Sequence, residues 1–287
     1  VLKHMEIKTQ KIRQNTHEDN QNIKDADNMG EVIVITSGKG GVGKSSSIIS
    51  IASMLADKGY RVLMIDMDLG LKNLDIMMGL QHRVIFDLKD VLEGKCTLSK
   101  AILKDKKQEN LFLLPACKSV HIENFPKERL PRVITRLKEE YDYLLFDTPA
   151  GMESGFLHTL AHVRKWIIVT TADVTALQDA DKMIGILMRE GIDDISFVLN
   201  RVRIHMMEKG ESVSIEDAKS WLCVPFLGYV SENEAVIKAN NHGLPLVQQE
   251  KNEIYHCYDC ITRRLLGEHV PLPVLKREGF FHRLWKR

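Results

Sequence analysis

One stretch near the start of the chain, EVIVITSGKGGVGKSSSIIS over residues 31–50, constrains the fold more than any other. Val32–Ile35 is a continuous apolar run rich in β-branched residues, which is typical of a strand buried on both faces of a parallel sheet. Gly38–Ser45 then satisfies the spacing G-x-x-x-x-G-K-[ST], and Ser46–Leu55 carries the apolar content of a helix. A strand, a glycine turn and a helix in this order predict a phosphate-binding P-loop.

The residue types in this loop suit a phosphate ligand. Glycines let the backbone turn tightly and point consecutive N–H groups inward, which makes an anion-binding nest at a helix N-terminus. Lys44 is expected to reach the β- and γ-phosphates, and the Ser45 hydroxyl is expected to ligate Mg²⁺. The predicted nucleotide ligands in the loop are Gly40, Gly41, Val42, Gly43, Lys44, Ser45 and Ser46.

Aspartates follow two further apolar runs. Arg61–Asp66 reads RVLMID and is predicted to be a buried strand, so Asp66 and Asp68 fall at the sheet edge where α/β proteins bind ligands. Asp66 is placed to hold a Mg²⁺-bound water and Asp68 to orient an attacking water. The alternative, a loop whose acids cap the next helix, is weakened by the P-loop that precedes it. Tyr143–Asp147 reads YLLFD, a Walker B pattern in which the strand fixes Asp147 beside Mg²⁺.

Strands and helices alternate along the rest of the chain. Further strands are predicted at 111–114, 166–170, 195–199 and 226–230, and helices at 84–92, 98–103, 127–140, 173–189 and 249–266, with one more ending at 240. This alternation predicts an α/β fold with one doubly wound, mostly parallel sheet. We assign residues 29–268 to a P-loop ATPase domain. At the tip of the 195–199 strand, Asn200 is expected to read an adenine edge and Arg201 to stack on the base or close the pocket.

The two ends of the chain have a different composition from the predicted domain. Residues 1–28 are rich in Asn and Gln, and their five basic residues cancel five acidic ones, so disorder is expected. Residues 269–287 are predicted to be a linker and an amphipathic helix. Its expected membrane-binding residues are Phe280, Phe281, Arg283, Leu284, Trp285 and Lys286. Apolar and basic residues occupy separate halves of this helix, which is the pattern of a helix lying in a membrane interface.

One copy of this tail would bind a membrane weakly, whereas two copies in a dimer would bind well through effective concentration. A terminal helix packed on the body and a partner-binding helix remain alternatives. No stretch approaches the ~18 apolar residues of a membrane span. The 40 basic and 39 acidic residues give no overall attraction to nucleic acid. Five cysteines at irregular spacings suit a reducing cytoplasm.

The motifs TSGKGGVGKSS, IDMDLGLKNLDIMMGL, FDTPAG, LNRVR and VIKANNHGLP, followed by the amphipathic tail, resemble the MinD family of septum site-determining ATPases within the ParA/MinD deviant Walker A group. The resemblance runs in order from about residue 29 to residue 287. It departs from the family at Ser45 and Ser46, where threonines are usual, and these changes keep the hydroxyl. It also departs at Ala172-Asp173, where Pro-Glu is usual, and at Gln178, where Arg is common; these changes bear on partner contacts.

The resemblance implies that Lys39, the second lysine of the glycine run, crosses a dimer interface to the partner's nucleotide. The implied catalytic residues are Lys39, Lys44 and Asp68, and the implied metal site is Ser45, Asp66 and Asp147. ATP and Mg²⁺ are then the cofactors. An ATP-bound homodimer would attach peripherally, from the cytoplasm, to anionic lipids of the inner membrane. There it would recruit the division inhibitor MinC, with MinE or a polar-anchor protein as its topological partner. No specific nucleic-acid binding is expected.

Three alternatives stay open on the same fold. An iron–sulfur carrier ATPase would use the C-x-x-C motif Cys257–Cys260, although the sequence holds no second such pair and two small apolar residues facing the core explain the spacing better. A MinD-like regulator of flagellar number would differ in its partner and not in its chemistry. A non-enzymatic membrane adaptor would bind nucleotide without releasing phosphate.

Overall fold

Strand β1, which leads into the P-loop, lies inside the sheet between β5 and β6. The computed structural model describes residues 29–68, 74–117, 125–151, 160 and 162–274. Its eight strands are β1 (Glu31–Thr36), β2 (Val62–Asp66), β3 (Leu103–Lys104), β4 (Leu111–Leu114), β5 (Tyr143–Asp147), β6 (Lys165–Thr171), β7 (Asp194–Val202) and β8 (Phe226–Ser231). They form one sheet in the order β3-β4-β2-β5-β1-β6-β7-β8.

All neighbouring strands of this sheet run parallel except β3 and β4. After β1, the strands β2, β3 and β4 are added on one side of it. The chain then forms β5 next to β1, and β6, β7 and β8 follow on the other side. Open α/β sheets bind ligands at such a reversal of strand order, beyond the carboxyl ends of the strands. The predicted doubly wound α/β fold is confirmed, and the P-loop lies at its reversal point.

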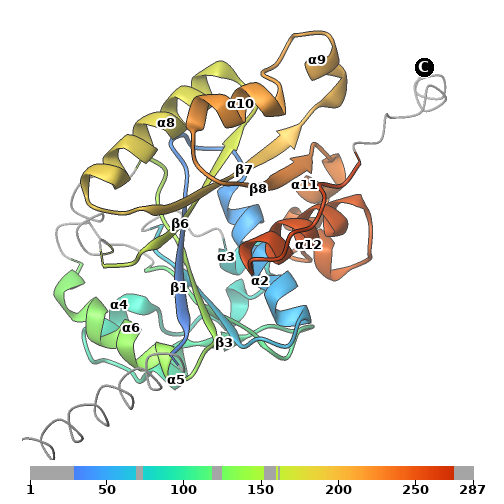
Figure 1. The fold of residues 1–287 in the computed structure, drawn as a ribbon. Helices are drawn as coiled ribbons and strands as arrows, with labels where there is room; N and C mark the ends of the chain where they lie inside the picture. Colours follow the sequence, from blue (N-terminus) through green and yellow to red (C-terminus); the bar gives the residue numbers. More distant parts are fainter. Residues whose placement is uncertain (1–28, 69–73, 118–124, 152–159, 161, 275–287) are drawn as a thin grey trace, which may run out of the picture.

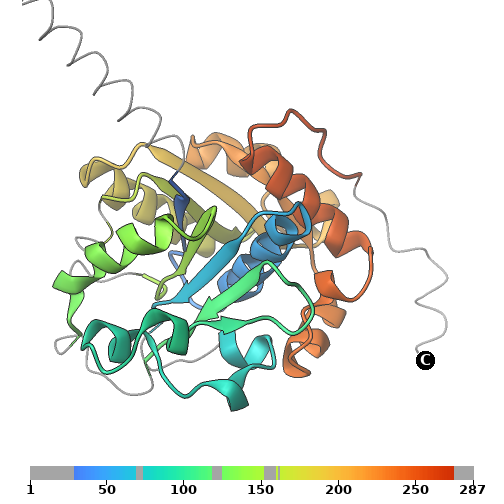
Figure 2. The same ribbon diagram turned by 90° about the horizontal axis from the view of Figure 1, so that it is seen from below.

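Helices cover both faces of the sheet (Figures 1 and 2). The α-helices are α2 (Lys44–Asp57), α3 (Leu74–Met77), α4 (Leu88–Leu92), α5 (Leu98–Ala101), α6 (Leu130–Lys138), α8 (Val174–Arg189), α9 (Ile204–Glu208), α10 (Ile215–Leu222), α11 (Glu234–Asn241) and α12 (Glu253–Leu265). Short 3₁₀ turns lie at Gln81–Arg83, Lys127–Arg129 and Leu246–Gln248. Helices α2 and α12 pack together on one face, and α6, α8 and α10 cover the other (Figure 2). No helix of the described residues is long and apolar enough to cross a membrane.

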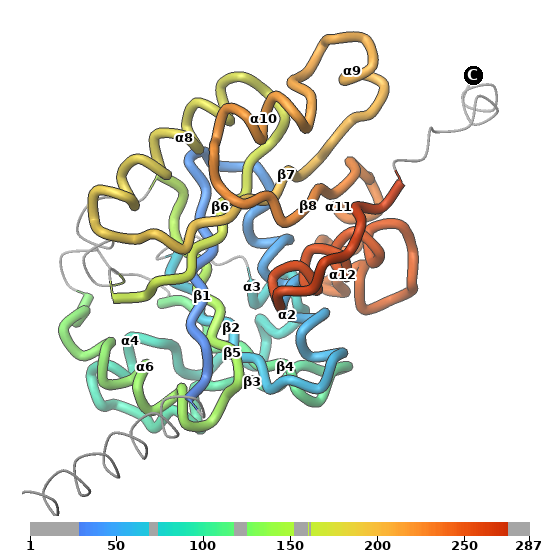
Figure 3. The backbone as a smooth tube through the Cα atoms, in the orientation of Figure 1, coloured from blue at the N-terminus to red at the C-terminus, as the bar shows by residue number. Residues whose placement is uncertain are grey.

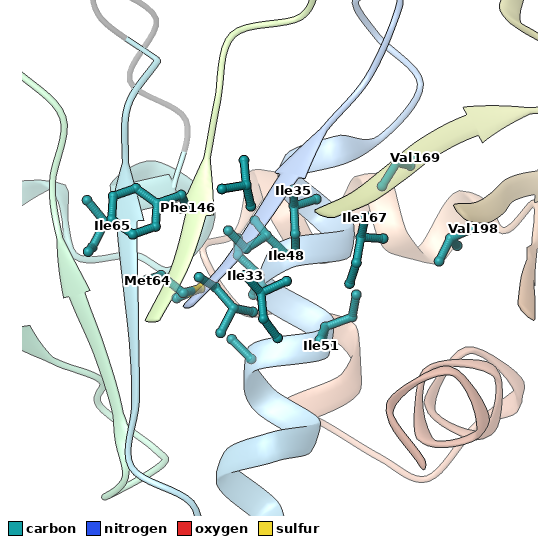
Figure 4. Close-up of a cluster of buried hydrophobic side chains, with 14 of the residues drawn as sticks. Ile33, Ile35, Ile48, Ile51, Met64, Ile65, Phe146, Ile167, Val169 and Val198 are labelled. Atoms are coloured by element: carbon teal, nitrogen blue, oxygen red, sulfur yellow. The ribbon is translucent and has the colours of Figure 1, made fainter. Parts of the chain in front are cut away.

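The core on the α2 side is built from alternate residues of adjacent strands (Figure 4). Ile33 and Ile35 of β1 lie beside Ile48 and Ile51 of α2, and all four are fully buried. Side chains alternate between the two faces along a strand. Ile35 pairs with Asp147 on β5, and Asp147 pairs with Asp66 on β2. The same register that buries Ile35 therefore turns both aspartates toward the α2 face, at the carboxyl edge.

Several predicted helices are shorter in the structure than the sequence indicates; the predicted 249–266 helix, for example, spans only Glu253–Leu265. Helix α5 ends at Ala101, and Leu103 enters β3, where it pairs antiparallel with Leu113 of β4; the prediction of helix at 98–103 is wrong at its end. Leu103 is buried at this sheet edge, which outweighs the helical pattern of the preceding residues. The predicted 84–92 helix begins only at Leu88, because Asp87 caps it through a reciprocal capping box with Asp90.

The P-loop packs closely on α8 at Gly38. A Cβ atom added to Gly38 would lie 2.2 Å from the backbone oxygen of Asp179 in α8. Backbone cannot retreat as a flexible side chain can, so a side chain at this position would push the loop and the helix apart. Gly185, also in α8, has nothing within 4 Å of such a Cβ atom.

We therefore expect Gly38→Ala to lower the free energy of unfolding by about 2 kcal/mol, the scale of an overpacked core site. Gly185→Ala, in the helix α8 against which Gly38 packs, is the matched control. It should raise the free energy of unfolding by up to about 1 kcal/mol through helix propensity. Urea unfolding monitored by circular dichroism measures both. Equal, small effects of the two substitutions would show that the loop does not depend on this contact.

Candidate nucleotide site

The P-loop turns into α2 through two glycines with left-handed backbone. Gly41 has φ 80° and Gly43 has φ 92°, and α2 begins at Lys44 with Gly43 as its N-cap. A side chain at Gly43 would also collide with Asn200, whose Nδ2 would lie 2.1 Å from an added Cβ. These positions require glycine, and they leave the first N–H groups of a 14-residue helix facing outward as an anion-binding end.

Lys44 and Ser45, the first two residues of α2, both donate to Asp147 at the end of β5. Lys44 forms a buried ion pair with Asp147 Oδ1, and Ser45 Oγ donates to Asp147 Oδ2 at 3.0 Å. Asp147 is 0% exposed, and burial raises the pKa of its carboxyl although both donors oppose that change. The P-loop and the aspartate that ends β5 are thus in direct contact in the structure.

Asp66 and Asp68 add further negative charge at the same edge. Asp66 is 1% exposed, and burial and the nearby Asp147 carboxylate raise its pKa well above the ordinary value. The Asp68 N–H donates to Asp66 Oδ1 at 3.0 Å, which holds the turn after β2. Burial also raises the pKa of Asp68, against the opposing effect of Lys44. Three carboxyl groups therefore surround a single buried ammonium group.

This donor set fits a hard divalent cation. Ser45 Oγ, Asp66 and Asp147 supply oxygen ligands, and a cation would relieve the repulsion between the two buried carboxylates. Within the described residues, no group of three or more His, Cys, Asp or Glu side chains is arranged to hold a metal ion. Such a set suits Mg²⁺ bound partly by protein and partly by phosphate oxygens and water, which is its usual mode at nucleotide sites.

A cleft of about 590 Å³ opens beside the P-loop, between the ends of β7 and β8 and helices α3 and α11. It is lined by Gly43, Ser46, Ile76, Met77, Asn200, Arg201, Arg203, Val230, Ser231, Glu232, Asn233, Glu234, Val236, Ile237, Asn240, Asn241 and Tyr258. Asn200 Nδ2 donates to the Val42 carbonyl at 2.8 Å, which ties the β7 tip to the P-loop. Arg201 lines the cleft with an unusual left-handed backbone, φ 54°. The cleft has the size and the polar rim that a nucleoside requires.

Several cleft residues were not predicted from the sequence. Asn240 Nδ2 donates to Ser46 Oγ at 2.9 Å, and Tyr258 shares a 3.0 Å hydrogen bond with Ser47 Oγ. Ser47 Oγ in turn donates to the Gly43 carbonyl at 3.0 Å. Asn240 lies inside the VIKANNHGLP motif and was therefore open to prediction. Tyr258 lies far along the chain on α12, and only the tertiary structure brings it to the P-loop.

Lys39 points away from the buried charges. Its Nζ donates to Thr175 Oγ1 at 3.3 Å at the start of α8, close to Asp173, which caps that helix. The contact is exposed, in contrast to that of Lys44. The structure therefore separates the two lysines, one buried at the phosphate end and one at the surface. The predicted membrane-binding residues Phe280, Phe281, Arg283, Leu284, Trp285 and Lys286 lie outside the described residues.

The C-x-x-C cysteines are not arranged as metal ligands. Cys257 and Cys260 are 1% and 6% exposed, on the face of α12 that packs on the core. Burial raises the pKa of Cys257 to about 11 and raises that of Cys260, so both remain neutral thiols near pH 7. A cluster ligand must be a thiolate that its metal can reach.

The substitution Asp66→Asn tests whether the Asp66 carboxylate destabilises the folded, nucleotide-free protein. We expect the nucleotide-free protein to gain about 1 kcal/mol or more near pH 7, because the substitution removes a buried like charge, while nucleotide binding in Mg²⁺ weakens. The folded state raises this pKa and so binds the proton more readily than the unfolded chain does. The gain should therefore shrink as the pH falls. Thermal unfolding and nucleotide titration measure the two effects, and lower stability at neutral pH would contradict this account.

Comparison with known proteins agrees with this geometry. A family model described as "ParA: NUBPL iron-transfer P-loop NTPase" matches residues 28–266. The septum site-determining protein MinD of Bacillus subtilis is 42% identical over 253 residues, covering 88% of this chain and 94% of the relative. The Helicobacter pylori protein of that name is 39% identical over 264 residues, covering 89% and 98%.

Solved structures give the same result. MinD of Aquifex aeolicus superposes with a TM-score of 0.78 at 36% identity, covering 85% of this chain and all of that one. The Pyrococcus horikoshii MinD complexed with Mg-ADP has a TM-score of 0.72 at 28% identity, covering 83% and 96%. With its P-loop, its paired aspartates and these relatives, the chain belongs to the MinD family of septum site-determining P-loop ATPases.

Proposed function

We propose that this chain, an ATPase of the MinD family, uses ATP binding to dimerise, to attach to the inner face of the cell membrane and to hold the septum inhibitor MinC there. By doing so it would position the division site. The observation that carries the proposal is the convergence of Lys44, Ser45 and Asp147 beside Asp66 and Asp68 at the P-loop. This arrangement suits the binding and hydrolysis of a nucleoside triphosphate.

In this mechanism ATP binding separates Lys44 from Asp147. With ATP bound, Lys44 donates to the β- and γ-phosphates, a favourable exchange because phosphate carries more charge than one carboxylate. Asp147 continues to accept from Ser45 and orients that hydroxyl toward the metal side of the nest. Mg²⁺, when bound, neutralises phosphate charge. Gly41 and Gly43 place backbone N–H groups against the phosphates with no side chain in the way.

Asp68 is the best-placed group to orient the attacking water. It is only partly buried, next to the fully buried Asp66, and its raised pKa increases its affinity for a water proton. Asn200 and Arg201 would bind the base at the cleft, with the Asn200 side chain already fixed by the Val42 carbonyl. The position of each residue at the cleft or beside the P-loop supports its proposed role.

Lys39 would act between two copies of the chain. Its ammonium group donates an exposed 3.3 Å hydrogen bond to Thr175 and lies near the Asp173 carboxylate, and both interactions cost little to break at the surface. A long cationic side chain at the carboxyl edge can therefore leave Thr175 and bind the phosphates of a facing protomer. Dimerisation would in turn pair two C-terminal tails, each too weak an anchor alone, on anionic lipid.

The structure of a MinC:MinD complex from Aquifex aeolicus supports MinC as a partner; this chain matches the complex with a TM-score of 0.77 at 38% identity. MinE or a polar-anchor protein would then stimulate release from the membrane. The iron-transfer description of the family model raises the iron–sulfur alternative again, but the buried neutral thiols of Cys257 and Cys260 do not favour it.

Lys39→Ala should abolish ATP-dependent dimerisation and reduce hydrolysis at least tenfold, while each monomer still binds ATP. Lys44→Ala should lose ATP binding itself, because it removes the buried phosphate ligand. Lys182→Ala, on the exposed side of α8, is the control and should behave as wild type. Light scattering with a non-hydrolysable ATP analogue measures the mass. A Lys39→Ala protein that dimerises and hydrolyses ATP normally would exclude the shared-nucleotide mechanism.

Membrane attachment is tested by co-sedimentation with anionic vesicles in ATP, in ADP and without nucleotide. The full chain should pellet in ATP only, and a chain ending at Leu275 should stay in the supernatant in all three conditions. The shortened chain keeps every described residue of the nucleotide site, so its ATP-dependent dimerisation serves as the control. Pelleting of the full chain without nucleotide would contradict the proposal.

A further inference from the structure

The residues between α12 and the C-terminal tail are held against the body by a series of side chains. We propose that residues 266–274 form a latched strap, and that Tyr229, Cys260 and Arg264 are positioning residues that fix where the membrane-binding tail leaves the protein. This inference rests on the proposed function, because it assigns the strap a part in membrane attachment. The segment from residue 269 is expected from the sequence to be a linker, and the proposal gives this linker a positioning role.

Three bonds hold the strap by its backbone. Arg264 Nη1 donates to the Val270 carbonyl at 3.3 Å, Cys260 Sγ donates to the Pro271 carbonyl at 3.3 Å, and the Tyr229 hydroxyl donates to the Pro273 carbonyl. The three donors come from α12 and β8, and their acceptors lie within four consecutive residues. A spacer that served only to connect two parts would need none of these bonds.

The donors keep their protons under ordinary conditions. Burial raises the pKa of the Tyr229 hydroxyl and that of the Cys260 thiol, so each remains a hydrogen-bond donor around neutral pH. Arg264 also donates through Nη2 to the Phe226 carbonyl at 3.2 Å, which joins the strap and the start of β8 through one guanidinium group.

Packing reinforces the latch. Leu272 of the strap is partly buried against the core, and it lies over Gly228 of β8. A Cβ atom at Gly228 would be 2.8 Å from Ile261 of α12 and 3.7 Å from Leu272. Glycine at this position therefore lets the helix and the strap approach the strand closely. Burial ends at the last residue of the strap, since Val274 is 87% exposed.

The strap has a direction that matters for the proposed dimer. Its start is bonded beside Phe226, where β8 begins, and its end is bonded to Tyr229, farther along that strand. Figures 1 and 3 show it rising past α12 toward the level at which β7 and β8 end. This is the edge of the sheet that carries the P-loop and Lys39. The tail therefore begins on the side of the molecule through which the ATP dimer would form.

The base of the strap is also fixed relative to the nucleotide site. Helix α12 is bonded to α2 through Tyr258 and Ser47, and Ser47 is bonded to the Gly43 carbonyl of the P-loop. If the nine strap residues were free, the tail's origin would wander by about 15–18 Å, the mean span of such a flexible segment. A latched origin keeps the second tail of a dimer at high effective concentration once the first has bound.

The test uses the full chain with Tyr229→Phe and Cys260→Ala combined, which removes two of the three bonds and little volume. Tyr255→Phe with Cys96→Ala is the matched control, because it removes a hydroxyl and a thiol that do not touch the strap. Hydrogen exchange should rise across residues 266–274 in the first variant only. Light scattering and phosphate release should show that both variants still dimerise in ATP and hydrolyse it at the wild-type rate.

Binding to anionic vesicles in ATP then decides the proposal. The strap variant should bind roughly three- to tenfold more weakly than wild type, as expected when the second tail loses effective concentration. Inserting nine Gly/Ser residues after Val274 should weaken binding to a similar extent, and adding the strap substitutions to this insertion should weaken it further, because the flexible length then doubles. Wild-type affinity in the strap variant, despite faster exchange, would overturn the latch. Absence of ATP-dependent binding in the wild type would instead overturn the proposed function.

Discussion

The buried contact between Lys44 and Asp147 is the point on which the rest of the site depends. It joins the first residue of α2 to the last residue of β5, and it sets the P-loop over the ends of the central strands. A buried ion pair of this kind contributes little net stability, because desolvation of both charges offsets their attraction. Its value is positional: it places a cation, a hydroxyl and carboxylates where a nucleotide's phosphates and metal would bind.

Much of this site follows from two periodicities in the sequence. Apolar runs of four to six residues predict the parallel strands, and the glycine spacing predicts the turn into α2. Both features are local. The structure adds the strand order and register, which put Asp66 and Asp147 on the same side of the sheet as Ile35.

Other features depend on distant contacts that leave no local pattern. Leu103 joins a strand because an edge of the sheet is available to cover it, although the preceding residues are helical. Tyr258 approaches the P-loop because α12 packs on α2, whereas Cys257 and Cys260 are buried where α12 packs on β8. The strap was predicted to be a linker because its prolines break helical patterns, whereas its bonds come from side chains on β8 and α12. Hydrogen bonds thus connect the P-loop to α12, and α12 to the strap from which the tail begins.

The central claim is that ATP makes a dimer whose paired tails bind the membrane. Mass photometry of single molecules on a supported anionic bilayer tests it most directly, because it reports oligomeric state and attachment together. The account predicts that particles on the bilayer have the mass of two chains in ATP, leave as ATP is consumed, and do not appear in ADP. Particles of one chain that remain on the bilayer in ATP and ADP alike would contradict it.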